Sequence, residues 1–160
     1  MEKFNINFGT PEQGWMEILI SSPSDVISLN VSDVPCDSLY GLVKVLTRLL
    51  EGSTEEVVKW SLEPEYAEWL FKRAGDEIEL SVRTPGDSLT GFNFRCEASK
   101  LIHRIYKSLW DLKVDPVWED KGVKESAWSW DFPGDRFMAL REKMAKIEQG
   151  ASVDTDKARR

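Results

Sequence analysis

The chain has 160 residues, of which 41% are hydrophobic and 31% charged, and its formal net charge is −7. A chain of this length can bury one substantial core, so neither disulfides nor a second domain is required. Its longest apolar runs are interrupted by a charge after five or six residues. A bilayer needs roughly 20, which excludes a membrane-spanning protein.

Only two cysteines are present, Cys36 and Cys96, and no apolar leader follows Met1. We therefore expect a cytoplasmic protein with no membrane partner. Residues 1–95 hold 16 acidic and 8 basic side chains, a net −8, whereas residues 96–160 hold 12 and 13, a net +1. Phosphate backbones repel an acidic surface, so this charge disfavours nucleic acid and favours a basic protein partner. Alternatively, the charge serves solubility alone.

The first third of the chain predicts three strands and a helix. Apolar and polar residues alternate with the period of a half-buried strand, and leucines then recur at helical spacing. Asp37 or Ser38 is expected to cap the helix, and Gly52 to end it. The predicted strands cover residues 4–8, 15–20 and 27–31, and the helix covers residues 39–50.

The remainder predicts four more strands and two more helices. Asp135 is the expected N-cap of the last helix and Gly150 its stop. An irregular segment precedes this helix, and residues 151–160, with Val153 as their one sizeable apolar residue, are expected to form a flexible tail. The strands cover residues 57–62, 67–72, 77–82 and 92–96, and the helices cover residues 98–112 and 135–150.

This order of elements predicts a single α+β domain over residues 1–150. The strands are joined largely by short turns, which favour a mostly antiparallel sheet of about seven strands. The apolar stripes of the helices must be buried, so two or three helices are expected to cover one face of that sheet.

Residues able to carry out catalysis are few. The one histidine, His103, is expected about 10 Å along a helix from Cys96, too far for a nucleophile and its base. Cys36 precedes a helix but is more simply a small buried residue. Glu77 and Glu79 share one strand face about 7 Å apart, yet alternating glutamates are ordinary on a wet strand face. The sequence therefore predicts that the protein is not an enzyme.

Cofactor and metal motifs are also missing. The chain has no C-x-x-C, no H-E-x-x-H, no phosphate-binding glycine loop and no calcium-binding loop. Lys100, Arg104 and Lys107 could contact phosphate, but three cations on one helix of an acidic protein are more simply its solvated face. We therefore predict no cofactor, no metal and no nucleic-acid partner.

Two groups of residues are candidates for binding. Five carboxylates of the acidic half are expected to form an electronegative face: Glu63, Glu65, Glu68, Glu77 and Glu79. Three of the seven tryptophans, Trp118, Trp128 and Trp130, flank the irregular segment before the last helix. They either cover the open edge of the core or form an exposed aromatic surface.

The first part of the chain resembles a group of small bacterial proteins, some of which are similar to immunity proteins of polymorphic toxin systems. The resemblance rests on the landmarks Phe8–Gly9–Thr10–Pro11–Glu12–Gln13–Gly14–Trp15, the leucine-rich helix, Leu62–Glu63–Pro64–Glu65–Tyr66 and Trp69, and it ends at about residue 110. It implies a bacterial, non-enzymatic, acidic protein that occludes a basic toxin, and it assigns no binding residue.

The sequence therefore favours a non-catalytic, immunity-type protein that binds a basic partner through an acidic surface. A small-molecule-binding protein or an enzyme is the alternative, with a pocket lined by the three tryptophans and with Cys36 or His103 nearby. A homodimer that pairs exposed strand edges is a third hypothesis. The oligomeric state stays open.

Overall fold

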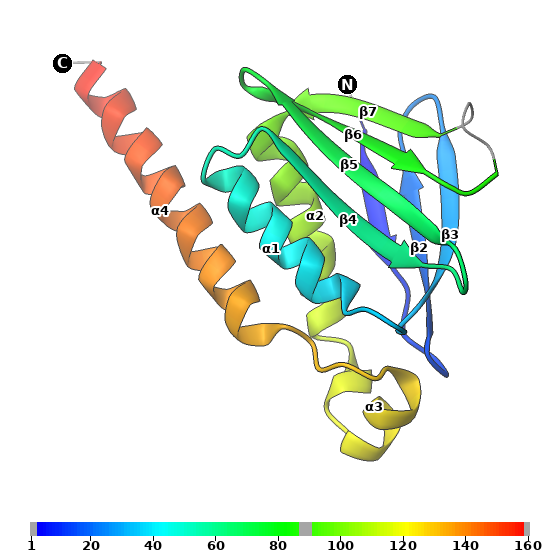
Figure 1. The fold of residues 1–160 in the computed structure, drawn as a ribbon. Helices are drawn as coiled ribbons and strands as arrows, with labels where there is room; N and C mark the ends of the chain where they lie inside the picture. The colour runs from blue at the N-terminus through cyan, green and yellow to red at the C-terminus, as the bar shows by residue number, and fades with distance from the viewer. Residues whose placement is uncertain (1–2, 87–90, 159–160) are drawn as a thin grey trace.

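A computed structural model describes residues 3–86 and 91–158. Within these ranges seven strands form one open antiparallel sheet in the order β1-β2-β3-β4-β5-β6-β7, which confirms the predicted fold class (Figure 1). The strands are β1 Asn5–Phe8, β2 Trp15–Ser21, β3 Val26–Ser32, β4 Glu55–Ser61, β5 Tyr66–Ala74, β6 Glu77–Arg83 and β7 Phe92–Glu97.

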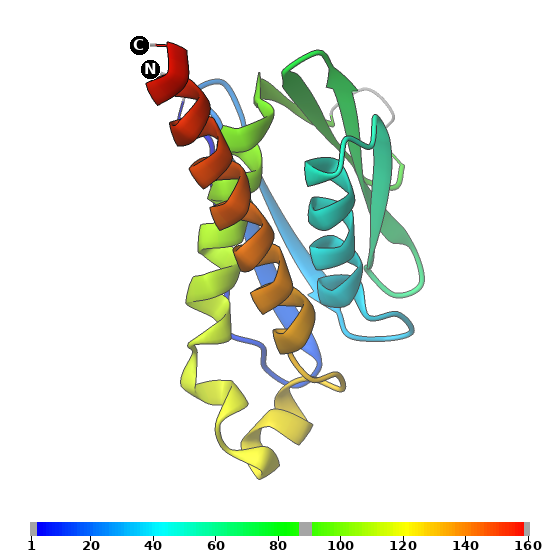
Figure 2. The same cartoon turned by 90° about the vertical axis from the view of Figure 1, so that its left-hand side faces the viewer.

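Helices cover one face of the sheet in two layers. α1 and α2 pack directly on the strands, and α4 lies across both helices on the side away from the sheet (Figures 1 and 2). The helices are α1 Ser38–Leu50, α2 Ala98–Lys113, the 3-10 turn η1 Pro116–Trp118, α3 Lys121–Ala127 and α4 Gly134–Ala158. No helix in the described ranges is both long and apolar enough to cross a membrane.

The alternation in the sequence determines which face each strand buries. In β6, Ile78, Leu80 and Val82 are fully buried against the helices, whereas the residues between them face outward. The stripes of α1 and α2 meet this face, with Leu46 and Leu109 among their fully buried residues. A single apolar core thus runs from the first strand to the start of α4.

The sheet curls strongly around this core. In the described part of the chain a single residue pair, Ser32 with Ser61, joins β3 to β4, so the two halves of the sheet splay apart there. Where the two outer edges of the sheet approach each other, the ring of Phe4, just before β1, stacks on the ring of Phe94 of β7, with centroids 5.0 Å apart. The first and last strands therefore approach each other without pairing, and α2 packs on both.

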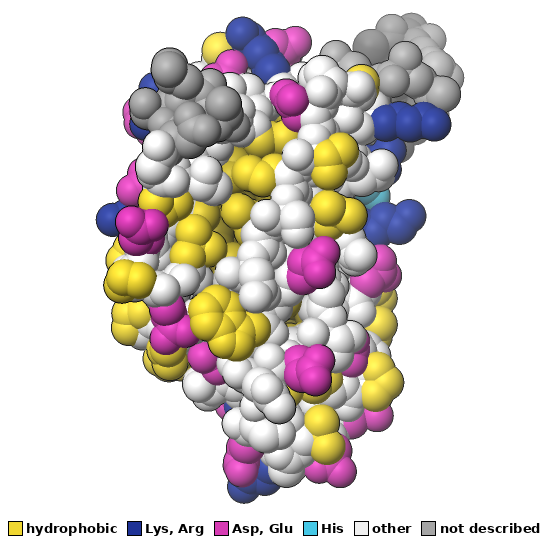
Figure 3. Space-filling view, turned by 90° about the vertical axis from the view of Figure 1, so that its right-hand side faces the viewer, with side chains coloured by type: hydrophobic (Ala, Val, Ile, Leu, Met, Phe, Trp, Pro, Cys, Tyr) yellow, Lys and Arg dark blue, Asp and Glu magenta, His cyan; other side chains and the backbone are white. Residues whose placement is uncertain are grey.

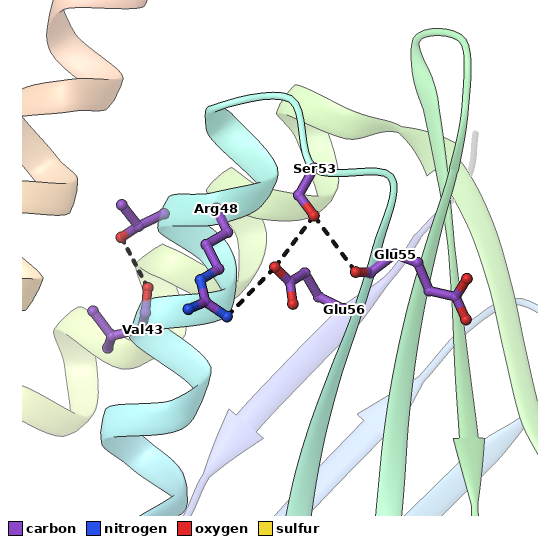
Figure 4. A network of polar contacts seen from close by, with 6 residues as sticks. Val43, Arg48, Ser53, Glu55 and Glu56 are labelled. Atoms are coloured by element: carbon purple, nitrogen blue, oxygen red, sulfur yellow. Dashed lines mark hydrogen bonds and ion pairs between the residues drawn. The ribbon is translucent and has the colours of Figure 1, made fainter.

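The predicted ends of α1 are confirmed. Asp37 caps the helix, because its Oδ1 accepts a hydrogen bond from the Tyr40 amide at 3.2 Å. After the helix, Gly52 adopts a φ of 99°, the left-handed conformation that stops a helix. Ser53 then donates to Glu56 Oε1 at 3.2 Å, and Arg48 pairs with the same oxygen at 3.8 Å, which ties α1 to β4 (Figure 4).

Three expectations for the C-terminal part are wrong. The segment between α2 and α4 is not irregular, because it holds η1 and α3, capped by Asp115 and Asp120. The last helix begins at Gly134, so Asp135 lies in its first turn and is not its N-cap. This helix also continues through Gly150 to Ala158. An interior glycine costs a helix only about 1 kcal/mol, and no proline follows to end it. The flexibility expected of residues 151–160 stays a prediction, and residues 159–160 lie outside the described ranges.

Candidate functional site

The outer face of the sheet does not carry a continuous acidic surface. Glu68 of β5 lies opposite Lys59 of β4 and Arg83 of β6. Glu79 of β6 similarly lies between Lys72 and Arg95. Figure 3, which views the side of the molecule away from the helices, shows acidic side chains scattered among hydrophobic and uncharged ones. Neighbouring cations therefore offset the field of these carboxylates.

The five nominated glutamates are also spread along the strands. Glu77 pairs with Arg95 at 2.6 Å and lies opposite Ala74, at the end of β5. Glu63 and Glu65 lie at the other end of that strand, in the turn between β4 and β5. Nine residues of strand separate the two ends, a distance of about 25 Å. The structure therefore does not gather the five into one site.

The three tryptophans near α3 occupy different environments. Trp128 is buried in the core, and Trp118 packs against the core and donates from Nε1 to the Leu112 carbonyl at 2.8 Å. Trp130 is the most exposed, at 36%, and its Nε1 donates to the Asp33 carbonyl at 2.6 Å. Two of the three indole rings therefore pack in or against the core. The three described rings do not form a shared aromatic surface.

The candidate nucleophiles and the base are divided between two separate places in the fold. Cys36 lies beside the start of α1, 3.6 Å from Ser38 Oγ. Cys96 and His103 line a different cavity, between β7 and α2. Within residues 3–86 and 91–158, no three His, Cys, Asp or Glu side chains are grouped as metal ligands.

A groove at the end of the molecule near α3 brings together carboxylates that lie far apart in the sequence. It has a volume of about 610 Å³ and runs between the β1–β2 connection and the segment of η1 and α3. Its walls are largely apolar. Among the described residues that line it, three are acidic, Glu12, Asp115 and Asp120, and none is basic. The lining residues are Thr10, Pro11, Glu12, Gln13, Asp115, Pro116, Val117, Asp120, Val123, Ser126 and Ala127.

One wall of the groove is a two-residue hairpin turn. Glu12 and Trp15 exchange backbone hydrogen bonds of 2.8 and 3.0 Å, and Gln13 and Gly14 between them have φ values of 51° and 84°. Two successive left-handed residues are typical of the tight turns that join antiparallel strands. The turn is attached to α3, because the Gly14 amide donates to the Ala127 carbonyl at 2.9 Å.

The opposite wall places two of the carboxylates at helix starts. Asp115 Oδ1 accepts from the Val117 amide at 2.9 Å, and its Oδ2 accepts from the Thr10 hydroxyl at 2.6 Å, which joins the two walls. Asp120 Oδ1 accepts from the Val123 amide at 3.1 Å. These bonds orient both carboxylates and leave lone pairs for a further donor.

A buried carboxylate behind the turn holds the walls together. Asp33 is 6% exposed, and its Oδ2 accepts from both the amide and the hydroxyl of Ser129 at 2.7 Å. Its own amide donates to the Gly14 carbonyl at 3.0 Å. Asp33 therefore joins the end of β3, the hairpin turn and the chain leaving α3.

One lysine of α3 forms an ion pair with a carboxylate outside the groove. Lys124 of α3 pairs with Asp131 at 2.7 Å and, with this hydrogen bond, lowers the pKa of that carboxyl. Asp131 does not line the groove, so this ion pair involves none of the lining residues. Outside the groove, desolvation raises the pKa of Asp37, while the hydrogen bond from Tyr40 opposes this rise.

Comparison of the chain with family models, with curated proteins and with solved structures gives no match. The resemblance to immunity proteins therefore stays a prediction.

Sequence reasoning missed the groove because its walls are distant in the chain. Thr10 and Asp115 are 105 residues apart. A local signal for the second wall was present, since Asp115–Pro116 pairs an N-cap residue with a proline at the first helical position.

Proposed function

We propose that this is a non-catalytic protein-binding protein whose acidic groove receives a basic segment of another protein. The proposal rests on Glu12, Asp115 and Asp120, which surround apolar walls, while no lysine or arginine of the described part of the chain lines the groove. A lysine or arginine side chain suits such a groove, because its methylene stem packs on apolar surface while its charge meets carboxylates.

The proposed binding site is the groove and not the set of glutamates on the strands that the sequence nominates. On the sheet, glutamates alternate with lysines and arginines, so a basic partner would meet both signs of charge. In the groove, Thr10 and two backbone amides hold two carboxylates in place, so little side-chain freedom is lost on binding. Occlusion of a basic toxin, as the resemblance implies, is one form of this function.

Two variants with equal charge change test the site. E12Q/D115N/D120N neutralises the groove and keeps an acceptor oxygen at both helix starts. E68Q/E77Q/E79Q neutralises three carboxylates of the sheet as the matched control. Calorimetric titration uses an acetylated peptide of alternating lysine and leucine, with a glutamate–leucine peptide as the negative control.

We expect the basic peptide to bind the wild type and the sheet variant alike, and to bind the groove variant at least tenfold more weakly, which is about 1.4 kcal/mol. Added salt should weaken the wild-type complex, because exposed charges are screened. The proposal fails if the peptide does not bind, or if the sheet variant loses affinity and the groove variant retains it.

A further inference from the structure

A second cavity lies where the two edges of the curled sheet approach each other under α2. It has a volume of about 490 Å³, within the range of small-molecule sites. Residues from before β1, from β7 and from the first turns of α2 line it. They are Phe4, Phe94, Cys96, Lys100, Leu101, His103 and Arg104.

One side of this cavity is apolar and built into the core. Phe4 and Phe94 stack with centroids 5.0 Å apart and an interplanar angle of 23°. Leu101 is fully buried, and Cys96 is 9% exposed. Stacked rings and an aliphatic side chain offer a rigid surface for an apolar group, whose burial releases water.

The other side carries positive charge. Lys100 and Arg104 are four residues apart on α2, so their side chains lie on the same face of the helix. Neither takes part in an ion pair with any residue of the described ranges. Arg104 donates to Asn5 Oδ1 at 3.4 Å, which holds the guanidinium at the edge of β1 and leaves its other N–H groups for a ligand.

We propose that this cavity binds a small amphipathic organic anion, with its carboxylate at Lys100 and Arg104 and its apolar part on Phe4 and Phe94. The ammonium and guanidinium supply charge-assisted hydrogen bonds to the carboxylate. This site is separate from the acidic groove and does not depend on the function proposed for it.

The test separates charge from apolar contact. Amide spectra of the ¹⁵N-labelled full chain are recorded during titration with octanoate and with phenylacetate. Octanol and phenethylamine are the neutral and cationic controls. The variant K100E/R104E reverses the charged rim, and K107E changes a cation of the same helix that does not line the cavity. Circular dichroism confirms that both variants fold.

We expect both carboxylates to shift the amides of β7 and of the first turns of α2. K100E/R104E should raise the dissociation constant about tenfold or more, a loss of about 1.4 kcal/mol. Under the same conditions K107E should change it less than twofold. Absence of shifts in these two elements, equal binding of octanol and octanoate, or equal affinity in K100E/R104E and the wild type would each overturn the proposal.

Discussion

Replacement of Asp33 by alanine should destabilise the protein by removing the carboxylate that joins three segments. Asp33 Oδ2 accepts two hydrogen bonds of 2.7 Å from Ser129. A hydrogen bond to a charged group contributes about 1.5 to 3 kcal/mol. Because Ser129 is exposed and water can replace part of the loss, we expect the two bonds together to be worth about 2 to 3 kcal/mol. The backbone bonds of residue 33 do not change.

Urea unfolding followed by tryptophan fluorescence measures this loss, and thermal unfolding should show a Tm lower by about 5 to 10 °C. S129A removes only the hydroxyl donor and should cost about 1 kcal/mol. D33N keeps an acceptor oxygen and should fall between S129A and D33A. A D33A protein within about 0.5 kcal/mol of the wild type, the range of an ordinary surface change, would refute this role.

Three further substitutions test the fold around the groove and the helices. G14A should destabilise by about 1 to 2 kcal/mol in urea unfolding, because residue 14 has a φ of 84° and a Cβ there would lie 3.1 Å from Asp33 Oδ1; an unchanged midpoint would contradict this. F137A should cost about 3 to 5 kcal/mol, because Phe137 is fully buried and stacks on Tyr106 at 4.9 Å; a cost below about 1 kcal/mol would mean that the start of α4 is not docked. Burial raises the pKa of Asp37 above 3.8, so its ionisation costs stability once the pH exceeds that value. D37N keeps the cap without this charge and should gain stability relative to the wild type as the pH rises from 3 to 7, whereas a constant difference would contradict the shift.

The strands and main helices were predictable because their signals are local. Ile78, Leu80 and Val82 alternate with polar residues, and this pattern places them in the core whichever strands are their neighbours. The N-cap at Asp37 and the stop at Gly52 were read in the same way. The stop at Gly150 was wrong because glycine ends a helix only where its left-handed conformation is used, and α4 continues past it.

The groove and the cavity could not be predicted because they depend on register and on contacts between distant segments. The sequence shows Glu68 among acidic neighbours, but strand pairing places Lys59 and Arg83 beside it. Likewise, Cys96 and His103 are separated along the chain. Because β7 passes directly into α2, both residues line one cavity. The composition therefore indicates an acidic protein but does not show which carboxylates lie together in the groove.

The most direct test of the acidic groove is to locate the bound basic peptide on the protein. Amide chemical shifts recorded during titration with the lysine–leucine peptide should change at residues 10–14 and 115–127, the two walls of the groove. The outer strands β4 to β6 should stay unchanged. Changes confined to those strands, with none at either wall, would contradict the account.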